Sequence, residues 1–410
     1  MKAIQFKFTI PRYVLGLALG KVSRKIFWSG LTCTDYKEIP APDLPNDDWV
    51  MIKTRYGGIC GTDTSTVSLI LSPYLTPFAS FPLTLGHEGV GHIAKIGTNV
   101  SDWQVGERVV VEPVLWCKPR GFEKLCRFCS RGEINRCERF IEGDIAPGIQ
   151  IGACRDTGGS WSPYFVAHKS QLYKIPEQVS DENALMIEPF AIALHAVLQN
   201  FPEDTDKVLI IGAGTIGLLT LVALRALGSQ AKIVVLGKHD FQADVAQKLG
   251  ASHVIIGDRK NGYYKEIAQW SEGNVENPAL GKPIVIGGFD STFECVGNKG
   301  TLDDSMRVTR NGGRVILMGA PGVIKDMDWT SIFTQELSVR AANLYNHVET
   351  YNGKKWKTFD LAIELLASGE VDLSWLVTHK YSIEDYKKAF DLTYQRGKNK
   401  AIKIAFMFDG

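Results

Sequence analysis

Three glycines between an apolar strand and a helix limit the possible folds of this chain more sharply than anything else in it. Gly212, Gly214 and Gly217 follow a strand expected at 207–211, and a helix is expected to begin near Thr215. Here Gly212 would permit a tight turn, Gly214 would let the backbone approach a pyrophosphate, and Gly217 would let helix and strand pack closely. The pyrophosphate would face the positive end of the helix. The pattern therefore predicts a dinucleotide-binding domain built on a doubly wound parallel sheet.

The remainder of the chain divides into two textures. From about Asp206 onward apolar strands alternate with helical stretches, which requires a parallel sheet covered by helices. Residues 1–170 are instead rich in Gly, Pro and short β-prone runs separated by turn residues. Such runs occur at 2–6, 49–54, 91–96 and 108–111. We therefore expect an α/β protein in which a mostly β domain precedes the doubly wound one.

The C-terminal residues contain too few elements for a third core. A helix is expected at 358–368, a strand and a helix within 381–394, and a final apolar strand at 401–408. We assign these elements back to the first domain and expect a helix at 189–199 to lead into the second. The predicted domains are residues 1–194 (mostly β), 195–343 (dinucleotide-binding) and 344–410 (return to the first domain).

Composition narrows the class of partner. The 410 residues include 46 basic and 45 acidic side chains, so no charge excess favours nucleic acid or an anionic membrane surface. With 45% hydrophobic residues the chain can bury sizeable cores, which excludes a disordered protein. The apolar run 208–224 is interrupted by glycines, and the apolar stretch 13–20 is short and lacks a cleavage pattern. We expect a cytoplasmic protein with a small-molecule partner and neither a nucleic-acid nor a membrane partner.

The end of the second strand of the parallel sheet bears on the choice of cofactor. A site that prefers NAD usually has Asp or Glu there, about 20 residues beyond the glycines, to bind the adenosine ribose. This chain has Gly237 followed by Lys238. A 2′-phosphate would meet no carboxylate and would be attracted by Lys238, so we predict NADP in preference to NAD. The alternative is that Asp240 binds the ribose and Lys238 is only solvated.

Two short segments of the first domain carry a specific pattern. They read Gly58-Ile-Cys60-Gly-Thr62-Asp63 and Gly86-His87-Glu88-Gly-Val-Gly91, the second continuing to Gly97 and Val100. Both resemble the zinc-dependent medium-chain dehydrogenase/reductase family of alcohol and polyol dehydrogenases. The resemblance extends to residue 408 and implies a GroES-like catalytic domain, a Rossmann domain and a returning C-terminal segment.

The resemblance also implies a catalytic zinc held by Cys60, His87 and Glu188, the last in a Glu-Pro segment like that of polyol dehydrogenases. Thiolate, imidazole and carboxylate suit zinc, and three protein ligands leave one position for water or substrate. Glu88 would orient the site or exchange into the ligand shell. Taken singly, the three ligands could be a small buried hydrophobe, a core histidine and a helix N-terminal charge. Together they favour the metal site.

A second metal site is indicated by the cysteines. Eight are too few for a disulfide-based fold of this length, yet four lie within residues 117–137. Cys126, Cys129 and Cys137 resemble three of the four thiolates of the family's structural zinc. The family's first cysteine would stand where this chain has Glu123, while Cys117 lies nine residues before Cys126. We predict that a longer loop brings Cys117 into the site; an empty or Glu-completed lobe is the alternative.

Further roles follow from the same resemblance. Thr62 matches the hydroxyl that begins the family's proton relay, but the relay's usual histidine is Ser65, which cannot hold a charge near neutral pH. Residues 68–81 are expected to wall the substrate cleft, and the insertion 11–28 to add a lid or an oligomer contact. Residues 337–344 resemble the strand through which family members pair, which predicts a homodimer or homotetramer.

These observations favour a zinc-dependent oxidoreductase that transfers a hydride between NADP(H) and a polyol, sugar or secondary alcohol or ketone. A zinc-free reductase of the same fold is one alternative, although such relatives lack the set of Cys60, His87 and Glu188. A non-catalytic NADPH-binding sensor or structural protein is another, because it would keep the three glycines and tolerate loss of the metal ligands.

Overall fold

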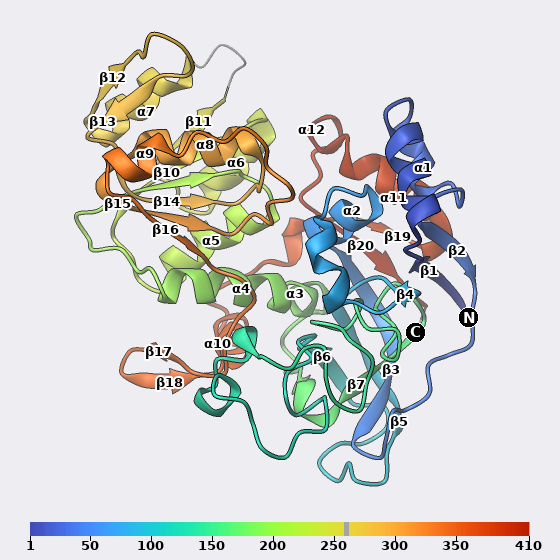
Figure 1. The fold of residues 1–410 in the computed structure, drawn as a ribbon. Coiled ribbons are helices and arrows are strands. Elements are labelled where there is room, and N and C mark those ends of the chain that lie inside the picture. The colour runs from blue at the N-terminus through green and yellow to red at the C-terminus, as the bar shows by residue number, and fades with distance from the viewer. Residues whose placement is uncertain (258–261, 410) are drawn as a thin grey trace. The chain divides into compact units, whose positions relative to one another are not determined.

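The computed structural model describes residues 1–257 and 262–409, which form two compact units (Figure 1). Helix α4 (Ile187–Leu198) runs across the division, and the boundary predicted between residues 194 and 195 falls within this helix. Unit 1 contains Met1–Glu188, Asn346–Val348 and Lys355–Gly410, and unit 2 contains Pro189–Tyr345 and Glu349–Lys354.

Unit 2 is built on a six-stranded parallel sheet with the order β11-β10-β9-β14-β15-β16. The strand order reverses between β9 and β14, which is the switch point where doubly wound sheets bind dinucleotides. The predicted doubly wound domain is thereby confirmed. The strands are β9 (Lys207–Ile211), β10 (Lys232–Gly237), β11 (His253–Ile256), β14 (Phe289–Glu294), β15 (Thr309–Leu317) and β16 (Ser338–Ala341).

Helices pack on this sheet because its strands are apolar on both faces. The apolar run 208–224 is β9 followed by α5, whose residues 217–224 are all buried against the sheet. In the part of the chain that the structure describes, no helix is long and apolar enough to cross a membrane. The other elements of unit 2 are α5 (Thr215–Ala226), α6 (Asp240–Lys248), α7 (Tyr263–Ser271), α8 (Lys299–Val308), α9 (Thr330–Thr334), β12 (Asn274–Glu276), β13 (Ile284–Ile286) and β17 (Glu349–Tyr351). Strand β18 (Lys354–Trp356) begins in unit 2 and ends in unit 1.

Unit 1 is mostly β, as predicted. A seven-stranded sheet has the order β19-β20-β3-β5-β6-β8 with β7 also paired to β3, and a three-stranded sheet has the order β2-β1-β4. The C-terminal strand β20, red in Figure 1, pairs antiparallel with β3, so the chain returns to the first unit. The strands are β1 (Lys2–Phe6), β2 (Thr34–Glu38), β3 (Trp49–Ile59), β4 (Leu83–Thr84), β5 (Gly89–Ile96), β6 (Arg108–Val111), β7 (Tyr164–His168), β8 (Leu172–Lys174), β19 (Val377–Tyr381) and β20 (Lys403–Met407).

Strand β3 is longer than the sequence predicts. It continues past Thr54 to Ile59 because Gly57 and Gly58 pair with β5 on one side and β20 on the other. A Cβ on Gly57 would lie 2.2 Å from the carbonyl oxygen of Ser160, so the close approach of that backbone requires glycine. The sequence pattern predicts turns where glycines occur in this region, whereas Gly57 and Gly58 lie within a tightly packed strand.

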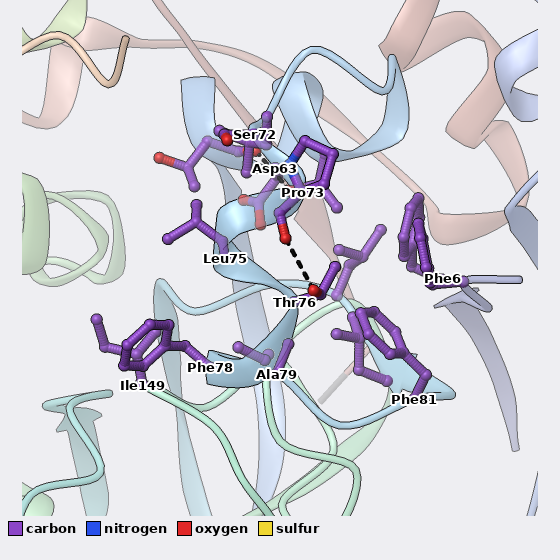
Figure 2. A pocket seen from close by; sticks show the side chains of 18 of the residues that line it. Phe6, Asp63, Ser72, Pro73, Leu75, Thr76, Phe78, Ala79, Phe81 and Ile149 are labelled. Atoms are coloured by element: carbon purple, nitrogen blue, oxygen red, sulfur yellow. Dashed lines mark hydrogen bonds between the residues drawn. The ribbon is translucent and has the colours of Figure 1, made fainter. Parts of the chain in front are cut away.

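The chain after β3 enters α2 and then η2, which line a cavity together with residues of β1 and of the loop 149–153 (Figure 2). This is the segment 68–81 that the sequence assigns to the substrate wall. The helices of unit 1 are α1 (Ile10–Gly20), α2 (Gly61–Val67), α3 (Asp181–Leu185), α10 (Thr358–Ala367), α11 (Tyr386–Thr393) and α12 (Arg396–Asn399), with short helices η1 (Arg24–Trp28), η2 (Pro73–Phe78), η3 (Cys129–Arg131), η4 (Ile134–Arg136), η5 (Lys169–Gln171), η6 (Ser374–Leu376) and η7 (Ile383–Asp385).

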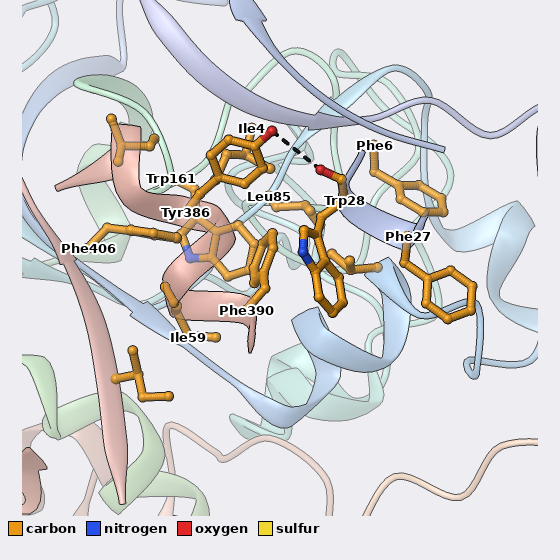
Figure 3. Close-up of a cluster of buried hydrophobic side chains, with 14 of the residues drawn as sticks. Ile4, Phe6, Phe27, Trp28, Ile59, Leu85, Trp161, Tyr386, Phe390 and Phe406 are labelled. Atoms are coloured by element: carbon orange, nitrogen blue, oxygen red, sulfur yellow. Dashed lines mark hydrogen bonds between the residues drawn. The ribbon is translucent and has the colours of Figure 1, made fainter. Parts of the chain in front are cut away.

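A core of aromatic side chains joins both ends of the chain in unit 1 (Figure 3). Trp28, from the inserted segment 11–28, lies with its ring 5.7 Å from that of Phe390 in α11, and its carbonyl accepts a hydrogen bond from Tyr386 at 3.3 Å. The insertion is therefore anchored in the core through η1. Helix α1 leaves Val14 and Leu17 exposed.

Candidate active site and metal clusters

Cys60 lies at the junction of β3 and α2. Its extended backbone (φ −87°, ψ 159°) makes it the N-cap of α2, and its N–H donates to Asp63 at 3.1 Å. The same turn carries Thr62. The glycine that follows Cys60 has open space where a Cβ would stand. A short capped helix thus fixes a thiol, a hydroxyl and a carboxylate within four residues.

His87 lies between β4 and β5 and is almost fully buried, with 6% of its surface exposed. Its Nδ1 is 3.3 Å from Asp63 Oδ1. Burial lowers the pKa of His87, but the Asp63 carboxylate and the Cys60 side chain together raise that pKa well above its ordinary value. A histidine whose Nδ1–H is held by a carboxylate presents Nε2 as its metal ligand. The sequence analysis assigned Asp63 no role of its own.

The structure brings Cys60, His87 and Glu88 together, with one ligand atom of each within 4.8 Å of the others. Glu88 is 1% exposed and forms an ion pair with Lys403, which is equally buried. A Cβ on Gly58 would overlap the Glu88 carboxylate, so glycine is required beside this pair. A buried carboxylate held by a lysine has its charge balanced inside the protein.

Lys403 is a site residue that the sequence analysis missed. It begins β20, and the neighbouring register pair Ile404 and Ile59 brings it to the start of α2. A charged residue within the otherwise apolar segment 401–408 was the available signal, because a lysine is rarely buried unless it is paired.

Glu188 lies outside the 4.8 Å set, although it was predicted as the third ligand. It is 1% exposed, and neither carboxylate oxygen has a hydrogen-bond partner among the residues that the structure describes. Burial raises the pKa of Glu188 to about 7, while His87 opposes this shift and Glu88 reinforces it. An unpartnered buried carboxylate is costly, and a cation is the partner that would satisfy it. Thiol, imidazole and this carboxylate are a donor set that fits zinc.

The four cysteines form a second, more compact group. The sulfur atoms of Cys117, Cys126, Cys129 and Cys137 lie within 4.8 Å of one another, and Cys117 Sγ is 3.7 Å from Cys137 Sγ. Backbone N–H groups point at these sulfurs, with Cys126 N donating to Cys117 at 3.3 Å. The Cys129 thiol donates to Cys137 and lowers the pKa of Cys137 to about 6. Glu123 is not part of the group.

Arg120 explains how the longer loop brings Cys117 into this group. The side chain is fully buried and has no carboxylate partner in the described residues. It instead donates five hydrogen bonds to backbone carbonyls of the same lobe. The acceptors are Leu115, Glu142, Ile145, Ala146 and Gly148, at 2.6 to 3.3 Å. The inserted residues between Cys117 and Cys126 therefore contain the side chain that holds their loop in place.

The glycine-rich turn has the geometry that the sequence predicts. Gly212 has φ +104°, a conformation that favours glycine, and Gly214 is the N-cap of α5 with open space around it. A Cβ on Gly217 would lie 1.7 Å from the carbonyl oxygen of Gly212. The first turn of α5 thus leaves backbone N–H groups for an anion.

The predicted cofactor-selecting residues lie at the end of β10. Gly237 is the last residue of the strand, Lys238 is exposed, and Asp240 begins α6. A Cβ on Gly237 would be 3.4 Å from Ala213, an ordinary contact, so the position accepts a side chain. His195, in α4, pairs with Glu349 at 2.5 Å.

Comparison with known proteins agrees with this architecture. Residues 46–177 match the family described as "Alcohol dehydrogenase GroES-like domain", and residues 215–368 match "Zinc-binding dehydrogenase". Sorbitol dehydrogenase of Bacillus subtilis (strain 168) is 29% identical over 367 residues, which are 89% of this chain and 92% of that protein. L-threonine 3-dehydrogenase of Anaeromyxobacter sp. (strain K) is 29% identical over 356 residues, 87% of this chain and 90% of the relative. The crystal structure of an Escherichia coli oxidoreductase/dehydrogenase of unknown specificity superposes with a TM-score of 0.71 at 26% identity, covering 92% of this chain and 96% of that one.

Proposed function

The chain belongs to the zinc-dependent medium-chain dehydrogenase/reductase family of alcohol and polyol dehydrogenases, and from this membership we propose that it transfers a hydride between NADP(H) and a polyol, sugar or secondary alcohol or the matching ketone. The observation that carries the proposal is that Cys60 meets the buried His87 and Glu88, close to the buried, unpartnered carboxylate of Glu188. In the oxidative direction the carbinol carbon gives its hydride to NADP⁺ and the hydroxyl gives up a proton.

We assign the catalytic zinc to Cys60, His87 and Glu188. Zinc would supply a Lewis acid that lowers the pKa of a bound hydroxyl toward neutrality. Asp63 holds Nδ1 of His87 and so fixes the ring with Nε2 available. The alternative is that Glu188 is no metal ligand but only a charge at a helix N-terminus. This alternative is weakened because the buried oxygens of Glu188 accept no hydrogen bond from α4 or from any other described element.

Thr62 and Glu88 are assigned supporting roles in the same site. Thr62, two residues after Cys60 on α2, would take the proton from the substrate hydroxyl and pass it toward water. Ser65 replaces the usual relay histidine and is one turn further along α2, so it can accept and donate a hydrogen bond but cannot store the proton. Glu88 is a positioning residue whose charge is balanced by Lys403.

The cofactor assignment rests on unit 2. Gly212, Gly214 and Gly217 would hold the pyrophosphate at the N-terminus of α5. Gly237 puts no carboxylate at the ribose, and the exposed amine of Lys238 would attract a 2′-phosphate. A charge-assisted contact of this kind supports a preference for NADP of about ten- to a hundredfold.

Two further assignments concern assembly. The group of Cys117, Cys126, Cys129 and Cys137 would hold a structural zinc, because four thiolates close a tetrahedral site. Strand β16 forms one edge of the parallel sheet with all four of its residues exposed, which supports pairing into a homodimer or homotetramer. A cytoplasmic location belongs to the same proposal.

The experiment is metal analysis of the purified chain combined with an alcohol and ketone panel run with both cofactors. Zinc-dependent turnover with NADP ahead of NAD supports the proposal. Turnover that persists without zinc would favour a zinc-free reductase, and NADPH binding without turnover of any alcohol or ketone would favour a sensor or structural protein.

A matched pair of variants tests the cofactor residues. Gly237→Asp combined with Lys238→Leu should reverse the preference toward NAD, since the new carboxylate would accept the ribose hydroxyls. Lys248→Leu, at the opposite end of α6, removes the same charge and should leave the preference unchanged. Faster wild-type turnover with NAD at equal concentration would show that Asp240 or another residue binds the ribose.

A further inference from the structure

A cavity of about 150 Å³ lies in unit 1 beside α2 (Figure 2). Its wall is mainly apolar and draws on segments far apart in the sequence. Aromatic rings line it from β1, the inserted α1, η2 and the loops that follow β1 and η2; they include Phe6, Phe8, Tyr13, Phe78 and Phe81. The ring of Phe8 is 5.4 Å from that of Tyr13 and 5.5 Å from that of Phe81, so three of them form one continuous surface.

The polar groups of this wall are mostly committed to the backbone. Thr66 donates its hydroxyl hydrogen bond to the carbonyl of Thr62 at 2.9 Å, and Thr76 donates to the carbonyl of Pro73 at 2.8 Å (Figure 2). A hydroxylated ligand group entering the cavity would lose its bonds to water and find few replacements. The cavity therefore favours a hydrocarbon group.

The cavity borders the turn of α2 that follows Cys60. Thr62 and Asp63 both belong to its wall, and Asp63 pairs with His87. A ligand whose hydroxyl carbon lies at Thr62 can therefore extend its remaining substituent among the aromatic rings. Tyr13 lies in the inserted segment 11–28, so this insertion contributes to the substrate wall.

We propose that the substrate is a secondary alcohol, or its ketone, carrying an apolar substituent about the size of benzene that fills this cavity. The proposal rests on the proposed function and selects the secondary-alcohol class over polyols and sugars. An apolar cavity of about 150 Å³ lined by side chains of this kind stays dry and accepts benzene. Each methylene buried contributes about fourfold to relative kcat/KM.

The first test compares kcat/KM for 2-propanol, 2-butanol, 1-phenylethanol and sorbitol in the wild-type enzyme. We expect 1-phenylethanol to exceed 2-propanol on the order of a hundredfold and sorbitol to be the poorest substrate. A higher kcat/KM for sorbitol than for 1-phenylethanol would overturn the proposal while leaving the dehydrogenase assignment intact.

Variants of the wall locate the effect. Ala79→Leu adds volume inside the cavity and should lower kcat/KM for 1-phenylethanol at least tenfold while changing that for 2-propanol less than twofold. Ala18→Leu, the same substitution on the exposed face of α1, should change neither. Tyr13→Ala enlarges the cavity instead and should improve turnover of a naphthyl-substituted alcohol relative to 1-phenylethanol.

Toluene provides a readout that does not depend on turnover. It should bind the metal-replete protein, raise its melting temperature and compete with 1-phenylethanol. Binding should survive Cys60→Ser and disappear in Ala79→Leu. If toluene binds but no alcohol or ketone is turned over, the proposed function fails and the cavity assignment stands. If 2-propanol is oxidised but toluene does not bind, the cavity assignment fails alone.

Discussion

The two metal-ligand groups of unit 1 are built in opposite ways. The four-cysteine group draws all its ligands from 21 consecutive residues, its donors are alike, and Arg120 ties its loop together through neutral carbonyls. The Cys60 group draws its ligands from separate elements, and its donors differ. Two of its members already have partners, because His87 pairs with Asp63 and Glu88 pairs with Lys403. A group with four protein ligands close together suits a structural metal. A group with three ligands, one of them a carboxylate without a hydrogen-bond partner, suits a metal site that also binds substrate.

Cysteine substitutions should give the largest difference between the two groups. Because a structural zinc contributes its binding free energy to folding, Cys129→Ser should lower the free energy of unfolding by several kcal/mol. Cys60→Ser should leave stability nearly unchanged but reduce turnover by about a thousandfold or more, because it removes a ligand of the catalytic metal. Denaturant unfolding and steady-state kinetics measure the two effects.

Cys33→Ser is the matched control, since Cys33 is buried as Cys129 is and belongs to neither group. It should change stability only modestly and keep both metals. Equal loss of stability in Cys60→Ser and Cys129→Ser would contradict the assignment of different roles.

Thr62→Val tests whether the threonine beside the Cys60 group takes part in proton transfer. The isosteric change removes the hydroxyl, so kcat should fall by about a hundredfold or more while zinc content and cofactor binding stay intact. Thr62→Ser should restore most of the activity. Thr64→Val, on the same helix with its hydroxyl bonded to the Gly61 carbonyl, serves as the control and should turn over normally. Unchanged kcat in Thr62→Val, where chemistry limits the rate, would reject the relay.

Acid release of zinc should also distinguish the two groups, but His168 titrates in the same pH range. Its effect on stability must therefore be measured separately. Burial lowers the pKa of His168 to about 4, against about 6.5 in the unfolded chain. Between these values the unfolded chain binds a proton that the folded chain does not, so stability is lost as pH falls from about 6.5 to 4. The loss amounts to about 3 kcal/mol.

His168→Asn should remove this pH dependence and keep the hydrogen bond that the side chain accepts from Ser170 N. The free energy of unfolding, measured across this window for both proteins, checks the difference. Parallel pH profiles in the two proteins would show that His168 is not the titrating group.

Asp63→Asn should have the smallest effect and should act on one group only. A carboxylate that orients a ligating histidine typically contributes ten- to a hundredfold to metal affinity. Zinc affinity at the Cys60 group should fall by that factor, while the four-cysteine group keeps its metal. Asparagine can still accept from Cys60 N, so the cap of α2 is preserved. Weakened binding at both groups would show a general loss of structure instead.

Local patterns in the sequence were enough to predict those features whose key residues lie close together in the chain. The glycines 212–217 predicted the parallel sheet, and the resemblance of the other three cysteines to a four-thiolate site predicted that a longer loop brings in Cys117; the structure has both the sheet and the four sulfurs together. Both predictions rest on residues within a short stretch of the chain. The roles of these residues stay predictions.

Contacts between distant segments could not be predicted in this way. Lys403 pairs with Glu88 across 315 residues, and this depends on the register of β20 against β3. The cavity wall likewise joins Phe6 and Tyr13 to η2 through packing that no local period encodes. The burial of Arg120 depends in the same way on how its loop folds around it, because the carbonyls that it binds lie up to 28 residues further along the chain.

Zinc content measured together with turnover during chelation shows whether one group of ligands is catalytic and the other structural. The metal-replete chain should contain two zinc ions, and a chelator should remove one in step with activity while the other stays until the protein unfolds. Added zinc should restore turnover. A chain that holds a single ion, which Cys129→Ser eliminates and Cys60→Ser does not, would contradict the account.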